Sequence, residues 1–266
     1  MKKTSSSLVG GLLAALVPIL AHAHTPYLAP ASFEPMHGGR VTLDAAFAEE
    51  FFVPEVVFDD SEFVVTGPDG ARVPAQTVHR LQTRAVIEHT LTAKGTYRFS
   101  SGRRLGAVFR TWQLDGKTES TRDPAKALPA GARLIAHYQS VNLAESYVTL
   151  GAPSRTALAP TGVGLEIVPV THPSDLYTGE SFLFELRFDG APLAGATVEI
   201  FPATGDGRSK QAAATLTTDT AGRARFALTR AGTWLALVRH RAKAPAGAAA
   251  PEYGYGYTLS FRVLDP

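Results

Sequence analysis

Short apolar runs separated by turn residues follow one another along most of the chain after residue 23. The runs are rich in valine, phenylalanine, tyrosine and threonine and lie between clusters of glycine, proline and aspartate, which is typical of antiparallel β-sandwiches. No segment keeps an apolar period of 3.6 residues between capping residues, so few helices are expected. We therefore predict an all-β fold, with strands that include residues 41–47, 63–66, 85–91, 96–100, 107–112 and 147–150.

The alternation of apolar and polar positions is clearest in the last part of the chain. From Phe182 to Phe188 every second residue is apolar, which predicts a strand with one buried face, and Asp189–Gly190 predicts the tight turn that follows. Proline and glycine interrupt the pattern at 159–162. We therefore expect two β-sandwich domains of Ig-like or transthyretin-like type, residues 24–160 and 161–266.

The first 23 residues have the three parts of a signal peptide. Lys2 and Lys3 are followed by an apolar run over residues 8–20 and then by Ala-His-Ala at 21–23. A membrane anchor would need about 20 apolar residues, and this run is shorter. The sequence predicts cleavage after Ala23, export to the periplasm and no membrane insertion of the mature chain.

Composition removes several classes of chemistry. The chain has no cysteine, which excludes disulfides, thiolate metal sites and cysteine nucleophiles. Loss of the leader removes two lysines and no acidic residue, so the predicted mature chain carries as many basic as acidic residues. This even balance of charge does not indicate a nucleic acid partner. The chain also lacks a GxSxG elbow and a Walker loop.

His24 is the most informative residue for function. Cleavage after Ala23 would give it a free amine beside its imidazole, and the amine and Nδ1 can chelate one metal ion together. Imidazole nitrogen suits nickel, cobalt, copper, iron and zinc. The alternative is that His24 is only a solvated terminus.

The segment from His24 to Pro30, with an aromatic residue at position 27 followed by Leu28, resembles the mature start of the DUF4198 family. Residues 145–151 and 164–170 resemble segments of the same family. That family is similar to periplasmic components of nickel and cobalt uptake systems, so the resemblance implies metal acquisition, with a membrane metal transporter or outer-membrane receptor as partner. Residues 189–198 and 218–226 resemble transthyretin-like and carboxypeptidase-regulatory-like modules, which are usually scaffolds or binding units.

A second metal ligand is needed beside His24, and four histidines enter the predicted metal set. His172 is the first choice because it follows a predicted strand near the domain junction, where pockets are common. His89 has an acidic neighbour, but adjacent strand residues face opposite sides. His240 lies between Arg239 and Arg241, whose charges oppose a bound cation. The set is His24, His172, His89 and His240; the other histidines of the predicted mature chain are scattered, and no HxH, HxxxH or HExxH spacing occurs after residue 23.

Three functions stay open at this point. The first is a periplasmic protein that binds a transition metal and assists its uptake or delivery, without turnover. The second is a copper-dependent oxidative enzyme, because an N-terminal histidine chelate resembles the copper site of lytic polysaccharide monooxygenases. The third is a structural or interaction module of the cell envelope. Tyrosines alternate with glycines over 253–257, which favours a packed strand over a sugar-stacking surface, and the Ala- and Pro-rich residues 242–251 predict a mobile loop outside the core.

Overall fold

The computed structural model describes residues 24–58, 60–204 and 211–266. The predicted signal peptide, residues 1–23, lies outside the described residues. The described chain is almost entirely β, with one short 3-10 helix, η1 (Thr156–Leu158), and no α-helix among these residues. The all-β prediction is confirmed.

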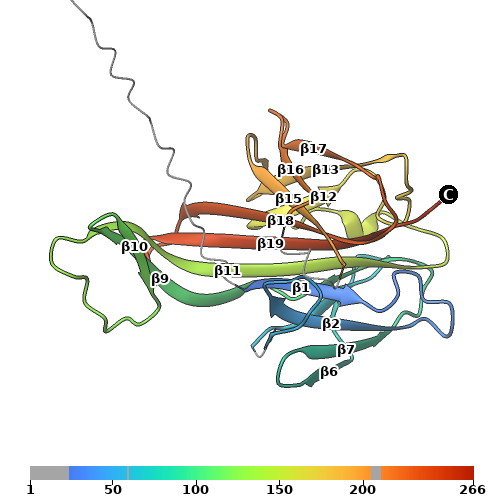
Figure 1. The fold of residues 1–266 in the computed structure, drawn as a ribbon. Helices are drawn as coiled ribbons and strands as arrows, with labels where there is room; N and C mark the ends of the chain where they lie inside the picture. The colour runs from blue at the N-terminus through green and yellow to red at the C-terminus, as the bar shows by residue number, and fades with distance from the viewer. Residues whose placement is uncertain (1–23, 59, 205–210) are drawn as a thin grey trace, which may run out of the picture.

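The strands form three sheets stacked as layers (Figure 1). We call them the N-terminal, central and C-terminal sheets. The N-terminal sheet contains β1 (Thr25–Pro30), β2 (Arg40–Ala48), β3 (Val56–Val57), β6 (Thr77–Arg80) and β7 (Ala85–Thr90). The C-terminal sheet contains β12 (Leu165–Pro169), β13 (Ser181–Phe188), β14 (Ala191–Pro192) and β17 (Arg223–Ala227).

The central sheet runs through the whole molecule and lies between the other two. Its main path has the order β16-β15-β18-β19-β11-β8-β4-β5, and β9 and β10 extend it beside β11. Its strands are β4 (Val64–Thr66), β5 (Arg72–Pro74), β8 (Gly95–Ser100), β9 (Arg104–Leu114), β10 (Lys117–Thr121), β11 (Arg133–Leu150), β15 (Thr197–Pro202), β16 (Ala214–Thr217), β18 (Gly232–Lys243) and β19 (Glu252–Val263).

Strand β11 joins the two halves of the chain in this one sheet. It pairs with β19 in parallel from Tyr138 to Ser146, while the other strand pairs that the structure describes here are antiparallel. The predicted boundary near residue 160 follows η1, yet the sheet is continuous across the two halves. The division into two domains stays a prediction.

Each face of the central sheet has its own core because side chains alternate along its strands. One core packs the C-terminal sheet, with Phe182 and Phe184, against β18 and β19. The other packs the N-terminal sheet, with Leu43 and Ile87, against β8 and β11. A third, smaller cluster joins β1 and β2 to the outer face of β15 and β18.

Two local predictions have clear outcomes. Asp189–Gly190 forms the two-residue turn between β13 and β14, with positive φ at both residues. The prediction for 242–251 is partly wrong: β18 continues to Lys243, and Ala244 and Ala250 are buried. Ala244 packs with Val141 and Tyr253, so this segment contributes to a small apolar cluster although its composition suggested a loop outside the core.

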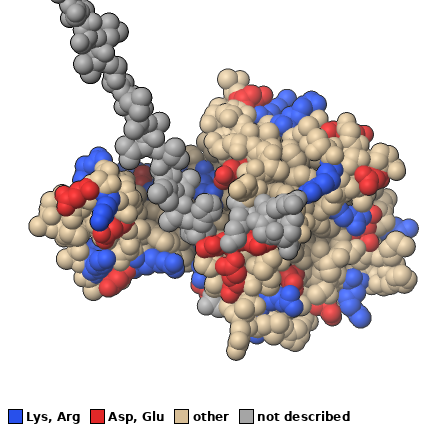
Figure 2. All heavy atoms as spheres, viewed as in Figure 1, with Lys and Arg blue, Asp and Glu red and all other residues tan. Residues whose placement is uncertain are grey.

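The surface gives two further observations. Lys and Arg lie interspersed with Asp and Glu on the face shown in Figure 2, so this face has no broad area of a single sign. Within the described part of the chain, no helix is long and apolar enough to cross a membrane.

Candidate functional site

A large cleft lies at the end of the central sheet where β9, β11, β18 and β19 run beside the start of β1. Its volume is about 620 Å³. Small-molecule sites usually enclose about 300–1,000 Å³, so the cleft has the size of a binding site. The polar and aromatic residues around it are His24, Thr25, Phe47, Arg104, Phe109, Arg122, Tyr138, Ser140, Asn142, Arg239, His240, Arg241 and Tyr255.

The start of β1 is fixed beside this cleft by contacts on both of its edges. Thr25 pairs with Ala48 of β2, and Arg239 donates a hydrogen bond to the Thr25 hydroxyl over 3.3 Å. The Thr258 hydroxyl donates to the Pro26 carbonyl over 2.8 Å. These contacts hold the backbone that follows His24, so His24 lies at the rim of the cleft.

The His24 ring has a defined partner. Its Nε2 lies 3.0 Å from Oε2 of Glu55, and both side chains are partly exposed. The other carboxylate oxygen of Glu55 accepts a hydrogen bond from the Glu49 backbone N–H over 3.1 Å. At this distance a neutral His24 donates its proton from Nε2, which leaves Nδ1 with a free lone pair.

His172 does not lie near His24. Its Nε2 is 3.0 Å from the Ser154 carbonyl and 3.2 Å from Oγ1 of Thr96, and its Nδ1 accepts the Ser174 N–H over 3.1 Å. Thr96 pairs with Thr149, whereas the cleft ends at Asn142, and that stretch of β11 is about 23 Å long. The structure therefore corrects the predicted pairing: His172 uses both ring nitrogens in local hydrogen bonds and shares no site with His24.

His89 and His240 are also packed within the fold. His89 is buried against Phe99, and its Nδ1 accepts the Gln76 N–H over 3.3 Å. The ring of His240 lies 4.6 Å from that of Phe188, so it faces away from its neighbours Arg239 and Arg241 although the residue borders the cleft. Burial lowers the pKa of both histidines.

No group of three or more His, Cys, Asp or Glu that could hold a metal ion occurs among the residues that the structure describes. His24 and Glu55 are the pair that the fold brings together. Sequence spacing gave no signal for Glu55, because it approaches His24 only through the pairing of β3 with β2. The arginines of the cleft were also missed as a group; the sequence marked two of them only as charges that disfavour a metal at His240.

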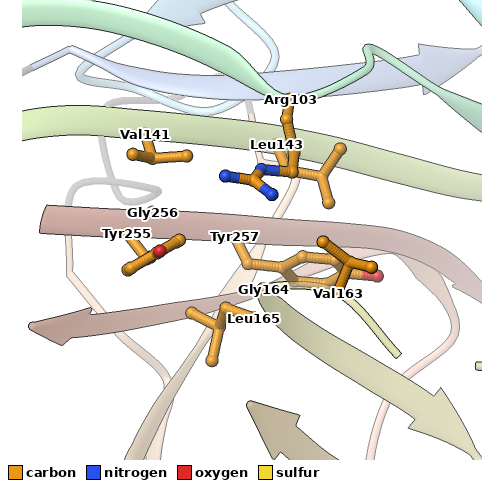
Figure 3. A pocket seen from close by; sticks show the side chains of 9 residues that line it. All are labelled: Arg103, Val141, Leu143, Val163, Gly164, Leu165, Tyr255, Gly256 and Tyr257. Atoms are coloured by element: carbon orange, nitrogen blue, oxygen red, sulfur yellow. The ribbon is translucent and has the colours of Figure 1, made fainter. Parts of the chain in front are cut away.

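A second hollow lies on the opposite face of β11 and β19 (Figure 3). Arg103 reaches over it toward Tyr255 and Tyr257, and Val141 and Leu143 form its other side. Its volume is about 10 Å³, which is close to the space that one water molecule needs. This hollow is therefore too small for a ligand, and the large cleft is the candidate site.

These observations define a three-layer all-β protein with a large cleft, lined by arginines and aromatic rings, at the end of its central sheet. The family described as a domain of unknown function, DUF4198, matches residues 21–242, and the chain belongs to that family. No curated protein matches the sequence.

Among solved structures, the D0-D1 domain of intimin is similar at 12% identity, over 88% of this chain and 96% of that chain, with a TM-score of 0.21. The adhesin InvE of Yersinia pseudotuberculosis is similar at 12% identity, over 89% of this chain and 58% of that chain, also with a TM-score of 0.21.

Proposed function

We propose that this protein is exported to the periplasm and binds a transition metal ion there through the mature N-terminal His24, so that it assists metal uptake or delivery. Cleavage after Ala23 would create the amine, and the amine with Nδ1 would form the chelate. The role is binding and not turnover, with a membrane metal transporter or an outer-membrane receptor as partner. The family to which the chain belongs, and its resemblance to periplasmic components of nickel and cobalt uptake, support this direction.

The observation that carries the proposal is the contact between His24 and Glu55. Histidines that bind metals usually donate their other ring N–H to a carboxylate, which fixes the tautomer and raises the basicity of the ligating nitrogen. Glu55 lies 3.0 Å from Nε2 and is itself held by the Glu49 N–H. In the neutral ring this contact places the proton on Nε2, so that Nδ1, the nitrogen nearer the backbone, is the one that joins the chelate.

The donor set also limits the metal. Two nitrogens leave coordination positions open, which suits Cu(II) or Ni(II) held with water or with ligands brought by the metal. A chelate of one amine and one imidazole nitrogen is an open site in this sense. An open site fits a protein that accepts and releases its metal.

The test is calorimetric titration of the processed chain, beginning at His24, with Cu(II), Ni(II), Co(II), Zn(II) and Fe(II). We expect binding that is lost in His24→Ala and in a variant with one extra glycine before His24. Glu55→Gln should weaken binding by about 10- to 100-fold, the usual effect of removing an outer-shell carboxylate. His37→Ala, which changes an exposed histidine, is the matched control.

Two outcomes would contradict the proposal. The first is an affinity that is unchanged by the added glycine, since that residue removes the amine from the chelate ring. The second is no binding of any of the five metals, which would make His24 a solvated terminus and favour the interaction-module hypothesis.

A further inference from the structure

The floor of the large cleft consists of glycine. Gly254 and Gly256 of β19 line the cleft, while Tyr253 and Tyr257, which flank this pair of glycines along the strand, are buried. A Cβ at Gly254 would lie 2.5 Å from Cδ2 of the Tyr138 ring. Only glycine allows that ring to lie directly on the strand, so the Tyr-Gly alternation builds the floor of the cleft.

An ordered stack of side chains crosses this floor. The Phe109 and Tyr138 rings stack with centroids 5.1 Å apart and an interplanar angle of 13°. The Arg241 guanidinium lies 3.5 Å from the centre of the Tyr138 ring, and the Arg122 guanidinium lies 5.4 Å from that of Phe109. Stacking on aromatic faces orients a guanidinium while its N–H edge stays available for hydrogen bonds.

Arginines line the cleft, and carboxylates outside its lining pair with three of them: Asp60 with Arg104, Glu199 with Arg239 and Glu252 with Arg241. Arg104, Arg122, Arg239 and Arg241 line it, and no carboxylate does so among the described residues. Arg239 donates to Glu199 over 2.9 Å, whereas Arg241 is 3.6 Å from Glu252, too far for a strong hydrogen bond.

Uncharged donors face the same space. Asn142 and Tyr138 line the cleft. Neither side chain forms a hydrogen bond to another residue of the described chain, so the Asn142 amide and the Tyr138 hydroxyl are free for a ligand. The cleft therefore combines uncommitted donors with oriented guanidinium groups.

We propose that this cleft binds a small organic oxyanion that carries at least two carboxylate or phosphate groups. Arginine forks recognise both groups by paired N–H donors, and two arginines on one strand face, Arg239 and Arg241, are spaced for two such groups. The aromatic stack and the glycine floor give the carbon skeleton a flat surface. The oxyanion site uses none of the His24 chelate, so it stands whether or not a metal binds there.

The test is calorimetric titration of the metal-free processed chain with citrate, with glucose 6-phosphate and with glucose. Citrate probes carboxylates, glucose 6-phosphate probes phosphate, and glucose is the uncharged control. We expect one or both anions to bind and glucose not to bind, with an affinity that falls as salt is added. Arg241→Gln and Arg239→Gln should each weaken binding by about tenfold or more, since each removes a charge-assisted contact.

Matched variants separate this site from general charge and from the proposed metal site. Arg225→Gln, which removes an exposed arginine on β17, should leave the affinity unchanged. His24→Ala, which removes the proposed chelate, should lower the anion affinity far less than Arg241→Gln does. Gly254→Ala should weaken binding, because its new Cβ displaces Tyr138.

Two results would overturn the proposal. One is that neither anion binds more tightly than glucose. The other is that an anion binds equally well to the wild type and to the Arg239→Gln, Arg241→Gln double variant, with circular dichroism spectra that agree. The second result would mean that the anion binds elsewhere.

Discussion

A buried ion pair holds β11 at the place where the two halves of the chain meet. Arg98 of β8 and Glu145 of β11 are 7% and 6% exposed, and Nε of Arg98 lies 3.8 Å from Oε1 of Glu145. The second oxygen, Oε2, accepts a hydrogen bond from the Tyr257 hydroxyl over 2.7 Å. Burial and the Glu145 charge raise the pKa of Tyr257, so its phenol stays a donor. Glu145 thus joins strands from both halves.

Glu145→Gln removes the charge and keeps an oxygen for Tyr257. Burial alone would lower the pKa of Arg98, but Glu145 and the neighbouring tyrosines raise it, so Arg98 stays charged in the native state. Breaking one partner of a buried pair leaves an uncompensated charge and costs about 3–5 kcal/mol of unfolding free energy. Because the Arg98 guanidinium also donates to the Ala159 carbonyl over 3.2 Å, which offsets part of this cost, we expect about 3 kcal/mol.

The assay is equilibrium urea unfolding of the purified chain, followed by tryptophan fluorescence. Asp44→Asn is the matched control, since its partner Arg84 is 41% exposed and exposed pairs contribute at most about 1 kcal/mol. The double variant Arg98→Met, Glu145→Leu should recover much of the loss, because an apolar pair needs no compensation. Two results would refute the reasoning. One is a loss of unfolding free energy in Glu145→Gln no larger than that in Asp44→Asn. The other is a loss in the double variant larger than that in Glu145→Gln.

Two further predictions concern stability. Burial lowers the pKa of His89, so the unfolded chain takes up this proton before the native chain does as the pH falls below about 6.5. The free energy of unfolding should then fall by up to about 1.4 kcal/mol per pH unit. His89→Gln should flatten that slope, measured by urea unfolding between pH 7.5 and 5. Gly190→Ala places a side chain at φ +80° with its nearest neighbour at 3.7 Å, so backbone strain and not a clash should cost about 1–2 kcal/mol. An unfolding midpoint of Gly190→Ala equal to that of the wild type would contradict the prediction for Gly190. Equal pH slopes in the wild type and His89→Gln would contradict the prediction for His89.

The fold class and many strands could be predicted because each depends on local pattern. The alternation from Phe182 to Phe188 gave β13, and the Asp189–Gly190 pair gave its turn, since both signals lie within a few residues. The parallel pairing of β11 with β19 joins segments more than a hundred residues apart, and no short-range pattern encodes it. The apolar cluster of Ala244 with Val141 and Tyr253 escaped prediction for the same reason: alanine and proline composition does not reveal which residues pack against a segment.

The candidate site was predictable only where it depends on the chain terminus. His24 was found because a predicted cleavage site precedes it, whereas its partner Glu55 is brought close by the pairing of β3 with β2. His172 was chosen as the second metal ligand because it lies near the predicted domain junction. In the structure it contacts Ser154, beyond the end of β11 that lies away from the cleft. The sequence shows that a histidine follows a strand. It does not show which of its ring nitrogens already forms a hydrogen bond within the fold.

The cleft follows from the lengths of four strands more than from any motif. β9, β11, β18 and β19 are long strands, and their ends extend beyond the N-terminal and C-terminal sheets that cover the rest of the central sheet (Figure 1). The face of these ends that borders the cleft carries arginines and stacked aromatic rings, which combine apolar surface with groups that water can solvate. The glycines of β19 add no side chain to the buried clusters, where Tyr257 packs in the C-terminal core and Tyr253 packs with Val141 and Ala244. Gly254 is instead needed on the open face, because a Cβ there would clash with the Tyr138 ring. The close contact of this ring with β19 is therefore the feature that singles out this end of the sheet as the candidate site.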